Sequence, residues 1–298
     1  MRQIINRHEE DNHLVTLESL TKEIRDLIQC WSGRWIGVKP VFEKCVATLG
    51  KPDPTDESAH RVLALLSGGS AIANFVEHSC QKMSRTNREP DYHSRLHTTI
   101  VITSLTALLL KQRELSTSSK TNISLQETIL LVAMVGHDAG HDGTRNGSPC
   151  QLESRSYHLI EPLLKTAKCH PDDMYSIKRV IWGTDPTLIS PLHAGSSTTS
   201  FDLHKPVWQT ILCQESDILA SVLPEFANQM TQFLVDEWNK IDPISAAGLL
   251  SPGGRKYFLE NLAKFSSPAA HSFGLNELVI RQLSVLNEEN SLSKRGMS

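Results

Sequence analysis

The stretch Ser124–Gly143, with the sequence SLQETILLVAMVGHDAGHDG, carries the strongest indication of the fold. It begins with Ser124 and Glu127 at the spacing of a capping box, in which the two side chains bond each other's backbone N–H groups at a helix start. Nearly every residue from there to Val135 is apolar. A helix that is apolar on all sides is buried, so we predict a central helix of an α-helical bundle from Leu125 to about Val135.

Helical signals also dominate the sequence on both sides of this stretch. Apolar residues recur at three-to-four spacing between Leu20 and Trp31, which indicates one face of an amphipathic helix. No run of residues alternates in the manner of strands joined by a hairpin turn. We therefore predict an all-α fold, a single compact multi-helix domain spanning residues 1–298 with its motif-bearing core at about 60–265. Further helices are expected at about 59–82, 92–113, 152–167, 171–183, 206–222, 224–240, 254–264 and 275–288.

Polar and glycine-containing segments interrupt the helical pattern. The pair Gly68-Gly69 is expected to break a helix. The segment Asp185–Pro206, rich in Ser, Thr, Pro and His, is expected to be a surface loop and a candidate lid. His193 in this segment should then be solvated, whereas Trp182 just before it should pack in the core. Other turns and loops are expected at 51–56, 116–122 and 251–254.

Composition and charge narrow the classes of function. The chain of 298 residues has a formal net charge of −3, which favours neither nucleic acid nor an anionic membrane as a partner. Its apolar stretches are too short to span a bilayer, and its polar start lacks the apolar core of a signal peptide. Six cysteines without C-x-x-C spacing indicate reduced thiols rather than a zinc knuckle or a disulfide framework. We expect a cytoplasmic protein, whose oligomeric state the sequence leaves open.

The candidate chemistry concentrates where the predicted buried helix ends, in Gly136–Gly143. His137 and Asp138 offer an imidazole nitrogen and a carboxylate oxygen to one cation. His141 follows four residues after His137, on the same face if the turn stays helical. Imidazole with carboxylate suits zinc, manganese or iron, and a bridging carboxylate can recruit a second ion. An isolated His-Asp pair is, however, more often part of an ordinary polar loop.

Two other segments complete a metal-binding pattern. Upstream, His93 and His97 stand at i and i+4 at the predicted start of an apolar helix. Downstream, Asp217 lies in an otherwise apolar helix, where a metal would relieve the cost of burying a carboxylate. The chain thus presents the ordered set His97…His137-Asp138…Asp217. This set is the signature of the HD superfamily of metal-dependent phosphohydrolases.

Within that superfamily the sequence resembles the class I cyclic nucleotide phosphodiesterases. Their first motif, Tyr-His-Asn-x-x-His, is matched by Tyr92–His97 with serine in place of asparagine. Their second, His-Asp-x-x-His-x-Gly-x-x-Asn, is matched by His137–Asn146. A helix ending in Thr-Asp is matched by Thr184-Asp185, and the last metal aspartate is matched by Asp217. Four motifs in the family's order make the resemblance specific.

The resemblance implies an activity and a role for each matched residue. The activity is hydrolysis of a 3′,5′-cyclic nucleotide to the 5′-monophosphate by a hydroxide that two divalent ions activate. Asp138 would bridge to the second ion, magnesium or manganese, and His141 and Thr184 would belong to the shell around it. His93 would be the general acid that protonates the leaving ribose oxygen. The ligands of the tighter ion, zinc, would be His97, His137, Asp138 and Asp217.

The sequence departs from the family's pattern at several positions, some of them where a base is recognised. Ile100 stands where the family has an aspartate, and Ala220 stands where a base-contacting asparagine is frequent. A loose alignment of the family's purine-site phenylalanine with Phe258 puts Arg255 at the position of the purine-binding glutamine. Arg255 and Phe258 are therefore candidate substrate-binding residues. We predict weak discrimination between adenine and guanine, or a preference for another phosphoester.

Three other functions remain compatible with the sequence. An HD-type phosphohydrolase could act on another nucleotide or phosphoester, a non-catalytic binding or regulatory module could retain the metal geometry, and an HD-type oxygenase could hold two irons. The presence of His93 beside all four metal ligands argues against the non-catalytic module, because such a module needs no general acid.

Overall fold

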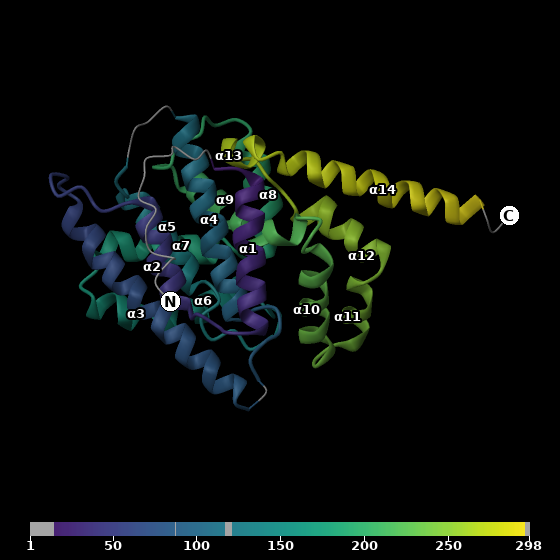
Figure 1. Ribbon diagram of the computed structural model, residues 1–298, viewed down its shortest axis with the longest axis horizontal. Coiled ribbons are helices and arrows are strands. Elements are labelled where there is room, and N and C mark those ends of the chain that lie inside the picture. The colour runs from purple at the N-terminus through teal and green to yellow at the C-terminus, as the bar shows by residue number, and fades with distance from the viewer. Residues whose placement is uncertain (1–14, 87, 117–120, 296–298) are drawn as a thin grey trace, which may run out of the picture.

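The computed structural model describes residues 15–86, 88–116 and 121–295, with side chains as far as residue 288. The start of the chain and most of the predicted 116–122 loop lie outside these residues. The described residues form helices and no strand, which confirms the all-α prediction (Figure 1). A short 3-10 helix (Pro186–Leu188) and a π-turn (Phe258–Leu262) join them. The α-helices are α1 (Leu17–Ser32), α2 (Val38–Leu49), α3 (Ala59–Ser84), α4 (Arg95–Leu115), α5 (Leu125–Gly136), α6 (Gln151–Thr166), α7 (Pro171–Trp182), α8 (Ile189–Ser196), α9 (Pro206–Val222), α10 (Ala227–Asn239), α11 (Pro243–Leu249), α12 (Pro252–Tyr257), α13 (Pro268–Ser272) and α14 (Leu275–Arg295).

Helix α5 is the central element, as its apolar sequence predicts. Ser124 accepts a hydrogen bond from the backbone N–H of Glu127, and the Glu127 carboxylate accepts one from the N–H of Ser124 at 2.8 Å, so the predicted capping box is present. All residues from Glu127 to Gly136 are buried. Helices α3, α4 and α7 pack around α5, which therefore ends inside the bundle.

Helix α3 runs unbroken through Gly68-Gly69, so the predicted interruption is wrong. The glycines serve close packing instead. A Cβ atom on Gly69 would lie 2.4 Å from Cζ of Phe42 and 3.0 Å from Val132, and one on Gly68 would lie 3.1 Å from Leu164. Because no side chain intervenes, α2, α5 and α6 approach the backbone of α3 directly.

The structure differs from the sequence expectations at four other places. Helix α2 was not predicted, although its buried residues follow helical spacing from Val38 to Leu49. The segment 185–206 is not one loop, because it contains the 3-10 helix and α8. His193 on α8 is buried rather than solvated, and Trp182 is 37% exposed rather than packed in the core.

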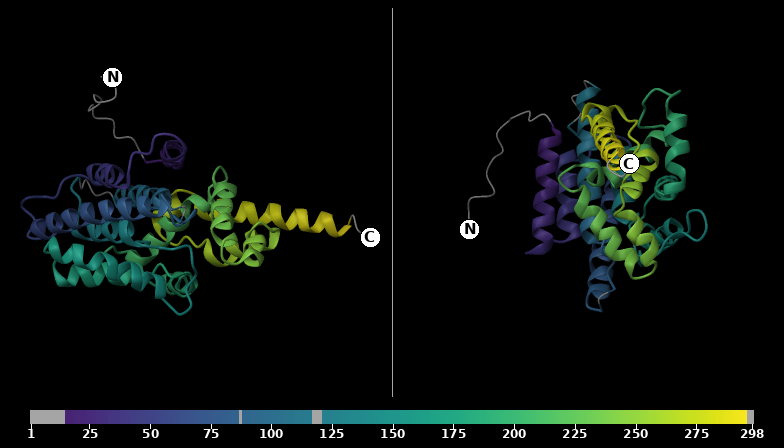
Figure 2. Two further views of the ribbon diagram at one scale, coloured as in Figure 1. Left: turned by 90° about the horizontal axis from the view of Figure 1, so that it is seen from below. Right: turned by 90° about the vertical axis from the view of Figure 1, so that its right-hand side faces the viewer.

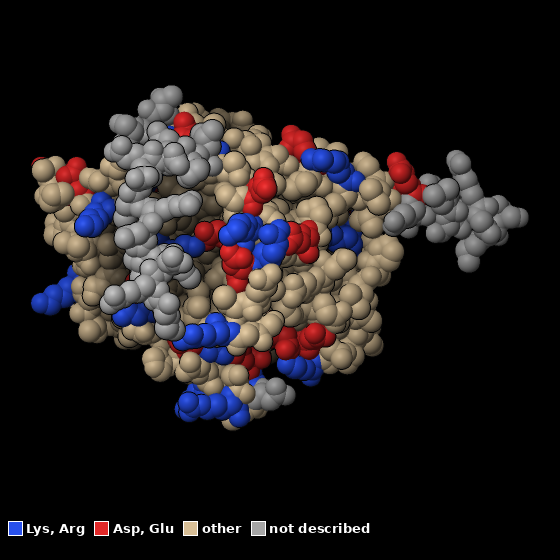
Figure 3. All heavy atoms as spheres, in the orientation of Figure 1, with Lys and Arg blue, Asp and Glu red and all other residues tan. Residues whose placement is uncertain are grey.

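The C-terminal helices lie at one end of the molecule, and α14 projects from it in both Figure 1 and the left view of Figure 2. Basic and acidic side chains intermingle over α1 on the face shown in Figure 3. Ion pairs there include Lys22 with Asp26 and Arg25 with Glu225. In the described part of the chain, no helix has both the length and the apolar character needed to cross a bilayer.

Candidate metal and catalytic site

Three helices distant in sequence bring the four predicted metal ligands together. His97 lies in the first turn of α4, His137 and Asp138 follow α5, and Asp217 lies on α9. Nε2 of His97 is 2.9 Å from Oδ1 of Asp217 and 3.5 Å from Oδ2 of Asp138. Nε2 of His137 is 3.1 Å from Oδ2 of Asp138 and 3.5 Å from Oδ1 of Asp217.

The donor atoms of this group fit a divalent metal ion. Nε2 of His97, Nε2 of His137 and Oδ2 of Asp138 are buried, and none of them forms a well-aligned hydrogen bond with any described residue, although they lie close to one another and to Asp217. This is an expensive condition for polar atoms. Nδ1 of His137 donates to the carbonyl oxygen of Met134 at 2.8 Å, which leaves a lone pair on Nε2. Two imidazoles and two carboxylates form a donor set typical of zinc and related ions.

The electrostatics of this four-residue group also favours a bound cation. Burial opposes ionisation of Asp138, but the neighbouring imidazoles of His137 and His93 hold its pKa well below the usual range. Burial likewise opposes protonation of His137, but Asp138 and Asp217 raise the pKa of His137 well above its usual range. The carboxylates thus attract positive charge to this point, and a metal ion would supply that charge.

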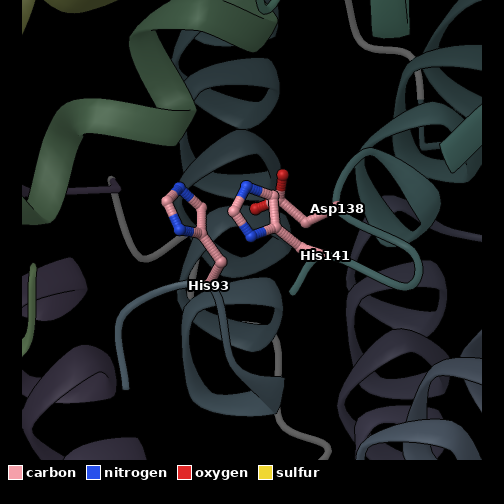
Figure 4. Close-up of side chains that lie close together, drawn as sticks. All are labelled: His93, Asp138 and His141. Atoms are coloured by element: carbon pink, nitrogen blue, oxygen red, sulfur yellow. The ribbon is translucent and has the colours of Figure 1, made fainter. Parts of the chain in front are cut away.

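A second group of possible metal donors adjoins the first and shares Asp138. His93, Asp138 and His141 each offer a donor atom within 4.8 Å of the others'. The rings of His93 and His141 lie face to face with centroids 3.8 Å apart, next to the Asp138 carboxylate (Figure 4). The chain leaves the helix before His141, since Gly140 has a φ of +71°, so the turn does not stay helical.

The hydrogen bonding of His141 favours a role as a hydrogen-bond donor over direct binding of a metal ion. Its Nδ1 accepts from the N–H of Gly143 at 3.0 Å, so the neutral ring carries its proton on Nε2. Burial and the neighbouring His93 lower the pKa of His141 to about 4, which keeps the ring neutral. A neutral ring of this tautomer can donate to an oxygen beside a second ion.

His93 is held by a residue that the motifs do not contain. It precedes α4 rather than lying within it, so the predicted i, i+4 helical pairing with His97 is wrong. The buried carboxylate of Glu237 on α10 contacts Nδ1 of His93 at 2.6 Å and accepts the backbone N–H groups of Tyr92 and His93 at 2.9 Å. Burial lowers the pKa of His93, but Glu237 and Asp138 raise it more, to about 9. The sequence carried one signal for this residue: Glu237 is seven positions from the buried Met230, on the same face of an amphipathic helix.

A second acid that the sequence analysis missed, Glu153 on α6, lies near the charges of Asp138 and Asp185. The side-chain amide of Asn146 donates to Glu153 at 3.0 Å and to Asp185 at 3.3 Å. Burial raises the pKa of Glu153, and the nearby charges of Asp185 and Asp138 raise it further. Glu153 shares the buried face of α6 with Ile160, a pattern that could have marked it as a buried acid.

The two remaining motif positions of the Thr-Asp element differ in their contacts. The buried hydroxyl of Thr184 donates to the carbonyl oxygen of Ile181 at 2.8 Å, within its own turn. Asp185 accepts from the backbone N–H of Cys150 at 2.7 Å as well as from Asn146. It is therefore Asp185 that ties this turn to the segment following the second motif.

Arg255 and Phe258 lie together but apart from the four-residue group. The Arg255 guanidinium stands 5.1 Å from the Phe258 ring centroid and donates to the carbonyl oxygen of Ser221 at 3.0 Å. Both residues line a cavity of about 70 Å³ together with Tyr92. The Tyr92 hydroxyl is 3.2 Å from that of Ser221, and its ring lies 4.7 Å from the His97 ring. Tyr92 is thus the structural link between this cavity and the four-residue group.

Comparison with known proteins identifies the fold. The sequence matches no protein-family model and no curated protein. The phosphodiesterase domain of the RhoPDE fusion protein from the choanoflagellate Salpingoeca rosetta aligns with a TM-score of 0.55 at 15% identity, over 95% of this chain and 93% of that one. A second solved structure, of the phosphodiesterase domain of Salpingoeca rosetta rhodopsin phosphodiesterase, aligns with a TM-score of 0.53 at 16% identity, over 86% of this chain and 96% of that one.

A third solved structure, LmjPDEB1 in complex with IBMX, aligns with a TM-score of 0.51 at 12% identity, over 92% of this chain and 98% of that one. At these identities the likeness shows the fold. The chain has the all-α fold of class I cyclic nucleotide phosphodiesterase domains, and the resemblance drawn from its motifs is confirmed at that level.

Proposed function

We propose that this protein hydrolyses a 3′,5′-cyclic nucleotide to the 5′-monophosphate with the help of two divalent metal ions. The observation that carries the proposal is the convergence of His97, His137, Asp138 and Asp217, with buried donor atoms that lack partners, beside the His93–Glu237 pair. The fold shared with phosphodiesterase domains supports it.

The four converging residues would hold the tighter ion, for which zinc suits the donor set. Asp138 belongs to both groups of donors and would therefore bridge to a second ion, magnesium or manganese. When bound, the two ions would supply Lewis-acid activation of a water nucleophile and neutralise charge on the phosphoryl oxygens. His141 and Thr184 would belong to the shell around the second ion, with His141 donating from Nε2.

His93 would act as the general acid. With Nδ1 engaged by Glu237, Nε2 is the nitrogen free to deliver a proton to the ribose oxygen as its bond to phosphorus breaks. A pKa of about 9 keeps the ring protonated at neutral pH, as an acid requires. Glu237 would be a positioning residue that fixes the ring and supports its charge.

A second candidate function is hydrolysis of another phosphoester by the same machinery. Two observations favour this second candidate. Ala220 offers no amide to a base, and Arg255 offers only donors where an amide would offer a donor and an acceptor. The ligand would in either case be a small molecule, in keeping with the IBMX complex of LmjPDEB1.

The decisive experiment measures hydrolysis of cyclic AMP, cyclic GMP, cyclic dinucleotides and nucleoside polyphosphates by the metal-loaded protein. We expect turnover of the two cyclic mononucleotides with a preference between them below about a hundredfold, roughly 2.7 kcal/mol in transition-state binding. Asp138→Ala should abolish it, since this change removes a ligand from both ions. Turnover confined to polyphosphates or dinucleotides would support the second candidate, and full activity of Asp138→Ala would contradict both.

A further inference from the structure

A pocket of about 520 Å³ opens between α7, α8 and the start of α9, and the proposed reaction makes no use of it. We call it the α7 pocket; its walls include Tyr175, Lys178, Arg179, Trp182, Leu192 and Val207. Its volume lies within the range of about 300–1,000 Å³ that is usual for small-molecule sites. The four residues that define the candidate metal site do not line it.

The charge of the α7 pocket is positive and uncompensated. Lys178 and Arg179 line it and no carboxylate does, in a chain whose net charge is −3. Neither cation forms an ion pair with any residue that the structure describes. One guanidinium nitrogen of Arg179 donates to the neutral side chain of Gln209, while its Nε is buried without an acceptor. Burial lowers the pKa of Arg179, so the protein bears a cost that a bound anion would relieve.

The walls of the α7 pocket are aromatic and apolar. Trp182 is 37% exposed and Tyr175 is 67% exposed, high fractions for large rings, and the two residues stand two turns apart on the same helix. The Lys178 ammonium lies over one face of the Trp182 ring, 4.4 Å from its centroid. Stacking of a nucleobase on an aromatic side chain contributes about 1–3 kcal/mol per base.

We propose that the α7 pocket binds a nucleoside monophosphate, with its phosphate at Arg179 and Lys178 and its base on the ring of Trp182. A guanidinium matches the geometry of a phosphate in a two-pronged contact, which favours Arg179 as the main phosphate partner. This proposal does not depend on the proposed hydrolysis, because no metal ligand contributes to the pocket.

The test is titration calorimetry with 5′-AMP and, separately, adenosine, on protein carrying Asp138→Ala so that metal-dependent binding at the candidate active site is removed. We expect 5′-AMP to bind at least tenfold more tightly than adenosine. Arg179→Met should weaken 5′-AMP by at least tenfold and Trp182→Leu by at least fivefold. Arg281→Met, at an exposed arginine of α14, is the matched control and should change nothing.

The comparison of 5′-AMP with adenosine needs no substitution in the pocket, so it remains informative if a pocket variant fails to fold. Equal binding of the two ligands, no binding of 5′-AMP, or undiminished binding by folded Arg179→Met would each overturn the proposal. Failure of the proposed hydrolysis would appear as absent turnover and would leave these titrations unchanged.

Discussion

The two histidines of the first motif have separable roles at the scale of single residues. His93→Ala should lower kcat by about 10²–10⁴-fold, the usual contribution of a general acid, while the metal content stays near that of the wild type. His97→Ala should reduce both, because Nε2 of His97 points at the carboxylates of the candidate metal site. Elemental analysis beside steady-state kinetics measures this. The exposed His204→Ala is the control, and loss of the tighter metal from His93→Ala would show that the roles are reversed.

The pH profile tests the pairing of His93 with Glu237. The acid must be protonated, and the carboxylate of Glu237 raises the pKa of His93, so the alkaline limb of activity should lie above the usual imidazole pKa of about 6.5. Glu237→Gln removes that charge and should move the alkaline limb of kcat/KM to lower pH, by about 1–3 units. Asp236→Asn, which changes the adjacent exposed acid, should leave the limb in place. An unmoved limb in Glu237→Gln would separate Glu237 from the acid.

The sequence predicted the positions of the motif residues better than it predicted the residues that hold them in place. His97, His137, Asp138 and Asp217 lie together as their order indicated, although their role as ligands stays a prediction. Glu237 was not foreseen because a single acid within an amphipathic helix looks like a solvated side chain. Its carboxylate binds the backbone N–H groups of Tyr92 and His93, just before α4, and its spacing from Met230 does not by itself predict that contact.

At the scale of elements, a buried acid joins α9 to the segment that leads into α13. Glu215 accepts the N–H groups of Ser266 and Ser267 at 2.6 and 2.7 Å and the Ser267 hydroxyl at 2.5 Å. These partners are neutral, and burial raises the pKa of Glu215 to about 7. The native state therefore retains a proton that the unfolded chain, with a pKa near 4.3, releases over this range.

The contribution of Glu215 to stability should consequently fall as pH rises from about 4.5 to 7 and change little above that, because this group binds a proton in the native state that it has lost in the unfolded one. The loss attributable to Glu215 is on the order of 3 kcal/mol. Glu215→Gln should flatten this part of the profile in denaturant unfolding of the metal-loaded protein. Glu18→Gln, at an exposed acid on α1, should keep the wild-type slope, and a wild-type slope in Glu215→Gln would refute the assignment.

Helices could be predicted where an apolar pattern continued over several turns. They could not be predicted where contacts between distant segments determined whether a helix forms. The continuous apolar run of α5 and the capping box at Ser124 were sufficient to locate that helix. Gly68-Gly69 suggested a break because glycine is a poor helix former, yet the close approach of Phe42 and Val132 outweighs that preference. The helix α8 within a polar segment is likewise stabilised by contacts with α9 that local sequence does not show.

At the scale of the whole molecule, the site depends on long-range packing that no local pattern shows. Helices α4, α5 and α9 are separated by loops and other helices, yet α4 packs along both α5 and α9. The four candidate ligands could be grouped without knowledge of this packing, because their order in the sequence matches the motif order of the family. The C-terminal part had no such guide, and Arg255 turned out to be held by Gln282 of the projecting α14 as well as by Ser221.

The buried donor atoms without partners give the metal a thermodynamic role besides its chemical one. A ligand that binds only the native state raises the free energy of unfolding by about 4 kcal/mol at a thousand times its dissociation constant. Here the bound ion would connect α4, α5 and α9, so it would act as a cross-link through the middle of the bundle.

We expect zinc to raise the melting temperature of chelator-treated protein by on the order of 10 °C. Asp217→Asn should respond much less, and an equal zinc response in that variant would place the ion elsewhere. The cell's supply of metal would then set how long the folded chain survives heat and proteolysis, whether or not substrate is present.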